Sequence, residues 1–156
     1  MKNNIARRDM VKQTIFVTGC ICTCSIRSSV AAQSDCCNTP NLEPESYTIK
    51  NDRIVIDLTK ASSLAKPGHA AFISDSEQEI ELIVVRPDSD GFVALTRFCT
   101  HGRQVLSYNK HRRLLQCNSY NHSLFDLDGT VWKGPAPRPL DSYEIEQSDQ
   151  ILTIYL

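Results

Sequence analysis

From residue 47 onward, apolar residues recur in short runs, and turn-forming residues separate the runs. Residues 53–58 alternate apolar and polar side chains, and residues 79–85 give the strongest strand signal. No part of residues 47–156 shows a sustained helical period. The predicted strands lie at residues 53–58, 70–73, 79–85, 92–98, 113–116, 129–132, 143–146 and 151–155. Many short strands separated by Pro and Gly turns predict an all-β sandwich or barrel.

The length and composition of the chain indicate one globular domain with a short N-terminal extension. Its 156 residues are 41% hydrophobic and 22% charged. The seven cysteines are unevenly placed, because five lie before residue 38 and only two lie in the strand-rich part. We therefore divide the chain into an export signal or anchor at residues 1–32, a linker at residues 33–46 and a domain at residues 47–156.

The N-terminal segment has the pattern of an export signal. Residues 6–12 read Ala-Arg-Arg-Asp-Met-Val-Lys and resemble a twin-arginine signal. An apolar run follows at residues 14–25, shorter than the roughly 20 residues that a membrane span needs. Residues 30–32 are small, as signal peptidases require. We expect export to the bacterial periplasm or the outer face of the cytoplasmic membrane. An accidental Arg pair in a soluble tail is the alternative.

Three fates of this segment stay open. Cleavage near Ala32 would release a soluble protein, whereas the uncut apolar run would attach the protein to the membrane. Residues 17–20 also resemble a lipoprotein processing site, which would place lipid on Cys20. The other N-terminal cysteines are interpreted as small apolar or linker residues, with a second metal site as the alternative for the last two: Cys22, Cys24, Cys36 and Cys37.

The charge of the chain bears on its partners. Without residues 1–32 it holds 12 Lys and Arg against 17 Asp and Glu, a formal charge of about −5. This balance argues against nucleic acid and favours a basic or neutral protein partner.

Two Cys/His pairs supply the candidate chemistry. Cys99 and His101 form the first pair, fifteen residues separate His101 from Cys117, and His122 completes the second pair. Two thiolates and two imidazoles suit a structural zinc ion. They equally suit a [2Fe-2S] centre in which both His bind one iron and both Cys bind the other. The order favours the second, because each loop then gives one ligand to each iron, whereas zinc fingers more often pair like with like.

The sequence around these residues resembles the Rieske family. The resemblance rests on Phe-Cys-Thr-His-Gly at residues 98–102, Ser-Leu-Phe-Asp-Leu-Asp-Gly at residues 123–129 and the proline-rich residues 134–140, and it covers residues 47–156. It implies a Rieske-type antiparallel sandwich or barrel with a small cluster-binding subdomain. It also implies a [2Fe-2S] cluster whose ligands are Cys99, His101, Cys117 and His122.

The second loop departs from the family pattern. Its usual form is Cys-x-x-His, yet Tyr120 stands at the third position after Cys117. The available histidine is His122, so the loop reads Cys-x₄-His. Aligned on Ser123 and Phe125-Asp126, the loop is one residue longer overall, and its Cys and His lie further apart. Loops tolerate such insertions. A zinc-stabilised binding domain stays open as the alternative. His69 and His111 lie in predicted turns and are interpreted as surface residues, and Asp128 with Gly129 predicts a turn.

The resemblance also assigns residues around the cluster. Quinol-oxidising members carry a disulfide between the loops, and the matching places near Gln104 and Ser119 hold no Cys. Ser123 matches the serine that donates a hydrogen bond to a bridging sulfide. Phe125 replaces the tyrosine that donates to a cysteine sulfur, so we expect a lower reduction potential. The prolines Pro135 and Pro137 are expected to cover the cluster.

The function that these features predict is one-electron transfer by an exported redox protein. Ser119 and Ser123 have no partner base in the sequence pattern, so a catalyst of bond chemistry is not expected. The partner is expected to be a redox protein such as a cytochrome or an oxidoreductase subunit. One alternative is the Rieske subunit of a larger cytochrome bc-type or other exported oxidoreductase complex. A Rieske oxygenase is not expected at this length.

Overall fold

The computed structural model of the chain describes residues 39–88, 91–120 and 122–156. All of these residues belong to one compact unit. The predicted export signal, its cleavage site and the five N-terminal cysteines lie outside the described residues. Among the residues described, no helix combines the length and the apolar character needed to cross a membrane.

The described residues contain eleven strands and two short 3₁₀ helices, so the predicted all-β class is confirmed. The helices are η1 (Pro44–Ser46) and η2 (Ser62–Leu64). The strands are β1 (Tyr47–Lys50), β2 (Arg53–Asp57), β3 (His69–Asp75), β4 (Ile80–Asp88), β5 (Gly91–Thr96), β6 (Leu106–Asn109), β7 (Leu114–Cys117), β8 (Leu124–Phe125), β9 (Val131–Lys133), β10 (Ser142–Ser148) and β11 (Ile151–Tyr155).

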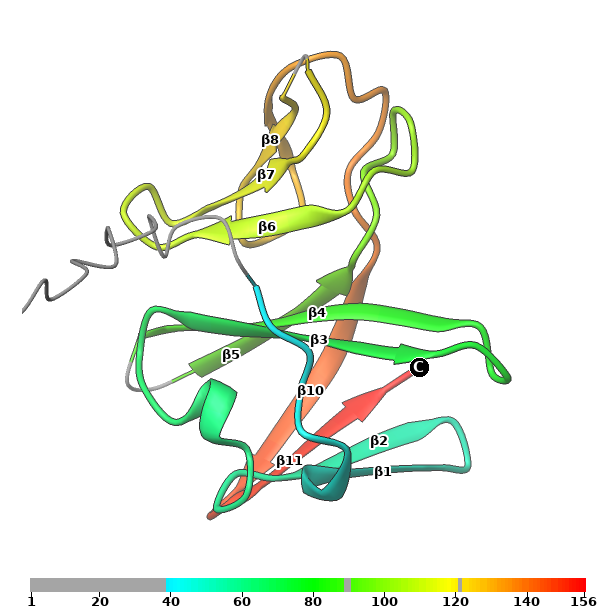
Figure 1. The fold of residues 1–156 in the computed structure, drawn as a ribbon, viewed down its shortest axis with the longest axis vertical. Coiled ribbons are helices and arrows are strands. Elements are labelled where there is room, and N and C mark those ends of the chain that lie inside the picture. The colour runs from blue at the N-terminus through cyan, green and yellow to red at the C-terminus, as the bar shows by residue number, and fades with distance from the viewer. Residues whose placement is uncertain (1–38, 89–90, 121) are drawn as a thin grey trace, which may run out of the picture. The chain divides into compact units, whose positions relative to one another are not determined.

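Seven strands form one antiparallel sheet in the order β1-β2-β11-β10-β5-β4-β3 (Figure 1). The longest ladder joins β3 to β4, from His69 opposite Arg86 to Asp75 opposite Ile80. The last strand, β11, pairs with β2 near the start of the fold. Strands from both ends of the described chain therefore form the sheet. The residues between β5 and β10 are not needed for it and form a separate structure.

This separate structure is a second antiparallel sheet of four strands, β6 to β9. These strands lie in sequence between β5 and β10, which are themselves neighbours in the large sheet. In Figure 1 the chain leaves the end of β5, builds the small sheet and returns through β10. We call residues 97–141 the inserted module. It corresponds to the small subdomain that the sequence analysis predicts, and it carries all four predicted metal ligands.

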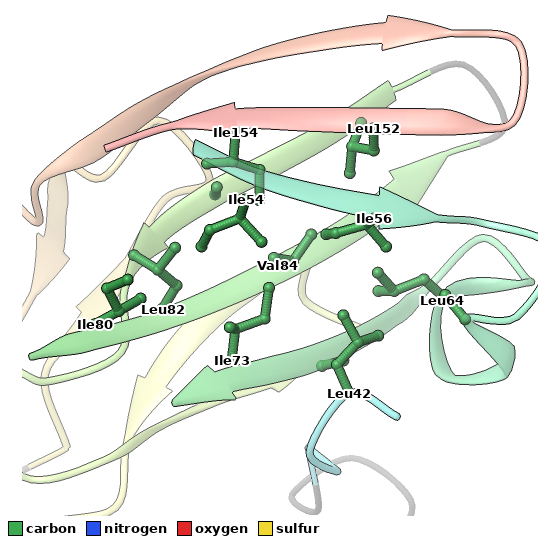
Figure 2. Close-up of a cluster of buried hydrophobic side chains, with 13 residues drawn as sticks. Leu42, Ile54, Ile56, Leu64, Ile73, Ile80, Leu82, Val84, Leu152 and Ile154 are labelled. Atoms are coloured by element: carbon green, nitrogen blue, oxygen red, sulfur yellow. The ribbon is translucent and has the colours of Figure 1, made fainter. Parts of the chain in front are cut away.

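One face of the large sheet supports a core of aliphatic side chains (Figure 2). Every second residue of β2, β3, β4 and β11 points into it, as the two-residue period of a strand requires. These residues are Ile54, Ile56, Ala71, Ile73, Ile80, Leu82, Val84, Leu152 and Ile154. The remaining members of this core are Leu42, Ala61, Leu64 of η2 and Ala94 of β5. Burial of such side chains is the main favourable contribution to folding.

The opposite face of β3, β4 and β5 packs against the inserted module. Phe72 and Ile83 of the large sheet share a second buried cluster with Leu106, Leu115 and Phe125 of the small sheet. Because β4 is covered on both faces, its residues from Leu82 to Val85 are all buried. Burial on both faces explains why residues 79–85 give such a strong apolar signal. It also makes the large sheet the platform on which the module rests.

The sequence pattern does not predict three of the strands, β1, β6 and β8. Each has four residues or fewer, too few for a clear two-residue period. The structure also shows a role for part of the segment assigned to the linker. Leu42 is 3% exposed, and Asn41 forms a β-bridge with Phe72. The apolar content of residues 39–46 is low, and only the tertiary contacts identify them as part of the fold.

The turn predicted at Asp128 is present and makes the stability depend on pH. Hydrogen bonds from the main chain and hydroxyl of Thr130, both 2.8 Å long, lower the pKa of Asp128 below its ordinary value of 3.8. A carboxylate with a lowered pKa stabilises the fold above its unfolded pKa and loses that contribution as pH falls through its folded pKa. We therefore expect Asp128→Ala to lower the free energy of unfolding more at neutral pH than in acid below the folded pKa of Asp128, where the carboxyl of the parent protein is protonated. Urea unfolding at several pH values measures this, and a difference that is constant with pH would contradict it.

Candidate metal centre

The first loop follows β5 and closes on itself. The main chain of Cys99 donates to the carbonyl of Gln104 at 2.8 Å, and Arg103 donates back to the carbonyl of Cys99 at 2.9 Å. A β-bridge between Phe98 and Val105 closes the base of the loop. Cys99 is 1% exposed, whereas the side chain of His101 is exposed. The loop therefore directs its thiol inward and places its imidazole at the surface.

The second loop follows β7 and is fixed at both of its ends. The main chain of Cys117 donates to the carbonyl of Ser123 at 2.9 Å. Asn118 donates to the carbonyl of Val105 at 3.1 Å, which joins the second loop to the first. His122 has a φ of 39°, and its main chain donates to the carbonyl of Ser119 at 3.2 Å. A tight left-handed turn thus accommodates the additional residue without opening the loop.

The two predicted cysteine ligands lie together in the interior. Both Cys99 and Cys117 are 1% exposed and free of disulfide bonds. Burial raises the pKa of the Cys117 thiol, hydrogen bonding with the side chain and main chain of Ser119 opposes the rise, and the neighbouring thiol of Cys99 adds to it. Two adjacent buried thiols favour deprotonation only when a cation compensates the charge. The pair is therefore a suitable thiolate site for a metal centre and a poor site for exposed thiol chemistry.

The imidazole of His122 has one occupied nitrogen and one that is available. Its Nδ1 lies 2.9 Å from the carbonyl oxygen of Cys117, so Nδ1 carries the proton and donates. The amide nitrogen of Gln116 is 3.5 Å from the same Nδ1, too long for a competing hydrogen bond. The lone pair therefore resides on Nε2. Histidine ligands of metals characteristically donate their other N–H to a carbonyl in this way.

The histidines are not gathered around the thiols. Among the described residues, no three His, Cys, Asp or Glu side chains lie close enough together to hold a metal ion. His101 and His122 are both exposed. The structure thus brings together two of the four predicted ligands and leaves the other two as a prediction. The remaining histidines, His69 and His111, are exposed, in agreement with their assignment as surface residues.

An unpartnered hydroxyl lies beside the second loop. Ser123 is 0% exposed, and its Oγ has no hydrogen-bond partner among the described protein atoms. A buried hydroxyl without a partner costs stability, so such groups usually face an acceptor. The bridging sulfide of the expected cluster is an acceptor of the right chemistry. Phe125 is also 0% exposed and has no donor. In donor chemistry the buried thiols and the Ser123 hydroxyl fit a [2Fe-2S] cluster, and the imidazoles of His101 and His122 stay its other expected ligands.

The proline-rich segment contacts Ser123 through a glycine. Gly134 has a φ of 113°, and a Cβ built on it would lie 2.6 Å from the Cα of Ser123 and 3.0 Å from its Oγ. The side chains of Pro135 and Pro137 are exposed, whereas Leu140 is buried. The segment therefore lies against the second loop through Gly134, and the two prolines stiffen it from outside.

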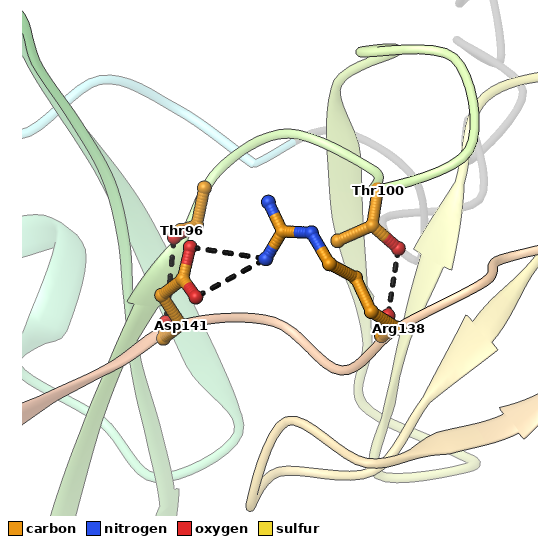
Figure 3. A network of polar contacts seen from close by, with 4 residues as sticks. All are labelled: Thr96, Thr100, Arg138 and Asp141. Carbon is orange, nitrogen blue, oxygen red and sulfur yellow. Dashed lines mark hydrogen bonds and ion pairs between the residues drawn. The ribbon is translucent and has the colours of Figure 1, made fainter.

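Polar contacts hold the same segment against the first loop (Figure 3). The hydroxyl of Thr100 donates to the carbonyl of Arg138 at 2.7 Å. The guanidinium of Arg138 pairs with Asp141 at 3.2 Å, and the main chain of Thr96 donates to the carbonyl of Asp141 at 2.9 Å. Thr100 lies between the predicted ligands Cys99 and His101. The sequence analysis does not identify it, because nothing in the local sequence signals a contact with residue 138.

Comparison with known proteins identifies the fold around this centre. The sequence matches the family described as "Rieske [2Fe-2S] domain" over residues 55–144. A search of curated proteins finds no match. The structure resembles the ferredoxin of carbazole 1,9a-dioxygenase from Nocardioides aromaticivorans, with a TM-score of 0.52 and 21% identity, covering 65% of this chain and 93% of that one.

Two further solved structures are similar. A chain from a complex of reduced oxygenase and oxidised ferredoxin in carbazole 1,9a-dioxygenase gives a TM-score of 0.53 and 21% identity, covering 65% of this chain and 92% of that one. The plasma-membrane Rieske protein of Synechocystis PCC 6803 gives a TM-score of 0.49 and 23% identity, covering 56% of this chain and 86% of that one. At these identities the first two likenesses bear on the fold alone.

Proposed function

The chain belongs to the Rieske [2Fe-2S] domain family, and from this premise we propose that it is a one-electron carrier in an exported redox protein. Members of the family bind a Rieske-type [2Fe-2S] cluster and transfer electrons through it. The family match extends over both loops of the candidate metal centre. The observation that carries the proposal is the buried, disulfide-free pair of Cys99 and Cys117 at the facing ends of those loops.

Each loop would supply one ligand to each iron of the cluster. Cys99 and Cys117 would hold one iron, and His101 and His122 would hold the other. When bound, the cluster accepts and releases a single electron. Burial of the two cysteines keeps water from the sulfur side. The exposure of His101 and His122 supports electron exchange at the imidazole side, where a partner protein has access.

The ligand set also predicts the range of the reduction potential. Two neutral imidazoles make the cluster less negative than four thiolates, which raises its potential above that of all-Cys ferredoxins. No cysteine stands at Gln104 or Ser119, so the loops lack the disulfide found in quinol-oxidising members of the family. The absence of that disulfide favours a protein partner over quinol as the electron donor.

Export and partner choice rest on the sequence. The twin-arginine pattern at residues 6–12 supports delivery of the folded protein to the periplasm or the outer face of the cytoplasmic membrane. The charge of about −5 for residues 33–156 supports a basic or neutral redox protein as partner. One of the similar structures is named as the ferredoxin of a dioxygenase, and it supports a protein as the redox partner. A place as the Rieske subunit of a larger exported oxidoreductase is the second form of the proposal.

A zinc-stabilised domain without redox activity is the competing function. The feature that keeps it open is the Cys-x₄-His loop, whose spacing departs from the Cys-x-x-His of the family. Zinc accepts Cys₂His₂ ligands in a tetrahedral arrangement and has no redox chemistry of its own. The two functions differ in which metal the purified protein contains.

Metal content and electron paramagnetic resonance of the dithionite-reduced protein test the proposal. We expect two irons and two acid-labile sulfides per chain, with a rhombic spectrum of low average g value. One zinc ion per chain and no signal after reduction would instead establish the zinc-stabilised domain. A signal that is lost when the chain is unfolded in urea provides the control that the cluster needs the folded loops.

A further inference from the structure

The hydroxyl of Ser119 lies 3.1 Å from the Sγ of Cys117. This contact joins the second loop to one of the two buried thiols. In the structure the thiol is the donor and the hydroxyl oxygen accepts. The sequence analysis gives Ser119 no role in the centre. It marks the residue only as a place without a disulfide cysteine.

The loop holds Ser119 in this position from both sides. The carbonyl of Ser119 accepts from the main chain of His122 at 3.2 Å, and the adjacent Asn118 donates to Val105 at 3.1 Å. The side chain of Ser119 is only partly buried, so its hydroxyl is free to reorient. Ser119 is one of four residues between Cys117 and His122. The longer loop therefore has room to turn a hydroxyl back onto its own cysteine.

We propose that Ser119 donates a hydrogen bond to the Cys117 thiolate in the cluster-bound protein and thereby raises the reduction potential of the cluster. This inference rests on the proposed function, because it requires a bound cluster. A metal-bound cysteine has lost its proton. The contact of 3.1 Å can then persist only if the hydroxyl donates, which needs rotation about one bond.

The effect on the potential follows from charge. Reduction adds one negative charge to the cluster and its sulfur ligands, and a donor hydrogen bond stabilises that charge. Ser119 would therefore favour the reduced state. In the family pattern a tyrosine provides such a bond, and in this chain Phe125, which has no donor, replaces it. Ser119 thus supplies from the loop the sulfur hydrogen bond that position 125 lacks.

The midpoint potential of the purified protein and three variants tests this inference. The variants are Ser119→Ala, which removes the hydroxyl, Ser119→Thr, which keeps it, and Ser107→Ala. Ser107 is a matched control, because its hydroxyl donates to the Asn118 side chain at 3.0 Å and contacts no cysteine sulfur. We expect Ser119→Ala to lower the equilibrium constant for one-electron reduction of the cluster by about three- to tenfold. A tenfold change corresponds to a midpoint potential lower by about 59 mV. Ser119→Thr and Ser107→Ala should stay close to the parent protein.

The outcomes separate this inference from the proposed function. Equal potentials for the parent and Ser119→Ala, both with two irons per chain, would overturn the role of Ser119 and leave electron transfer standing. An equal drop in Ser119→Thr and Ser107→Ala would also overturn it, because a general loosening of the loop would then explain the change. A parent protein without iron would overturn the proposed function and this inference with it.

Discussion

His122→Ala is expected to prevent cluster assembly, so that the purified variant contains almost no iron and gives no signal after reduction. Loss of a group that merely orients a metal ligand costs about 10–100-fold in metal affinity. Loss of a ligand should exceed about 100-fold. In the structure the His122 ring donates its Nδ1 proton to the Cys117 carbonyl at 2.9 Å, which holds the ring beside the cysteine of the same loop. Iron analysis and the spectrum of the reduced protein measure the loss.

Tyr120→Ala is the control for this variant. Tyr120 stands at the third position after Cys117, where the family pattern has its histidine, and its side chain is 96% exposed. We expect Tyr120→Ala to retain two irons per chain. His111→Ala should do the same, because His111 is an exposed residue of the β6–β7 turn. A cluster that survives in His122→Ala but is lost in Tyr120→Ala would show that the longer loop uses another register.

Gly134→Ala is expected to have the second large effect. The added Cβ would lie 2.6 Å from the Cα of Ser123, and the backbone φ of 113° is one that L-residues rarely adopt. Backbone strain of about 1–2 kcal/mol and overpacking of about 1–3 kcal/mol together predict a loss of about 2–5 kcal/mol. The strain falls on the contact with Ser123, so cluster retention should decrease together with stability. Urea unfolding and iron content measure the two effects.

Gly102→Ala is the matched control. Gly102 lies in the first loop next to His101, and a Cβ built on it would meet no atom within 4 Å. We expect this variant to unfold within about 0.5 kcal/mol of the parent, as surface substitutions usually do. Similar losses in Gly102→Ala and Gly134→Ala would show that any change near the loops disturbs the centre. The close approach at Ser123 would then have no special role.

The strands of the large sheet other than β1 could be predicted because their apolar residues follow the pleat. Residues 151–155 are an example, since β11 has the predicted bounds and buries Leu152 and Ile154. The pattern fails for β8, which has two residues and exists because β7 and β9 flank it. It also fails for Leu42, whose main chain donates to the carbonyl of Phe72, thirty residues further along the chain. Short strands and isolated anchors are fixed by tertiary contacts that local periodicity does not contain.

The candidate centre shows the same division. Cys99 and Cys117 could be predicted from their place in two family loops, and the structure brings these thiols together. The position of His122 could not be predicted, because an insertion changes the turn, and its ligand role stays a prediction. The contacts of Thr100 and Ser119 could not be predicted from the sequence for another reason. Each acts through one hydrogen bond, to Arg138 or to Cys117, whose geometry appears only in three dimensions.

The position of the inserted module between two paired strands has a consequence for how such a protein can change. The module leaves the large sheet after Thr96 and returns at Asp141, and these two residues are joined by a 2.9 Å hydrogen bond. A replacement module would therefore need neighbouring ends and an apolar face for the large-sheet side chains of the shared cluster, which are Ala70, Phe72, Ile83, Val85 and Leu95. Modules with different reduction potentials could therefore replace one another on the same large sheet while its aliphatic core stays unchanged. Selection could then act on the electron-carrying unit and on its carrier sheet as separate parts.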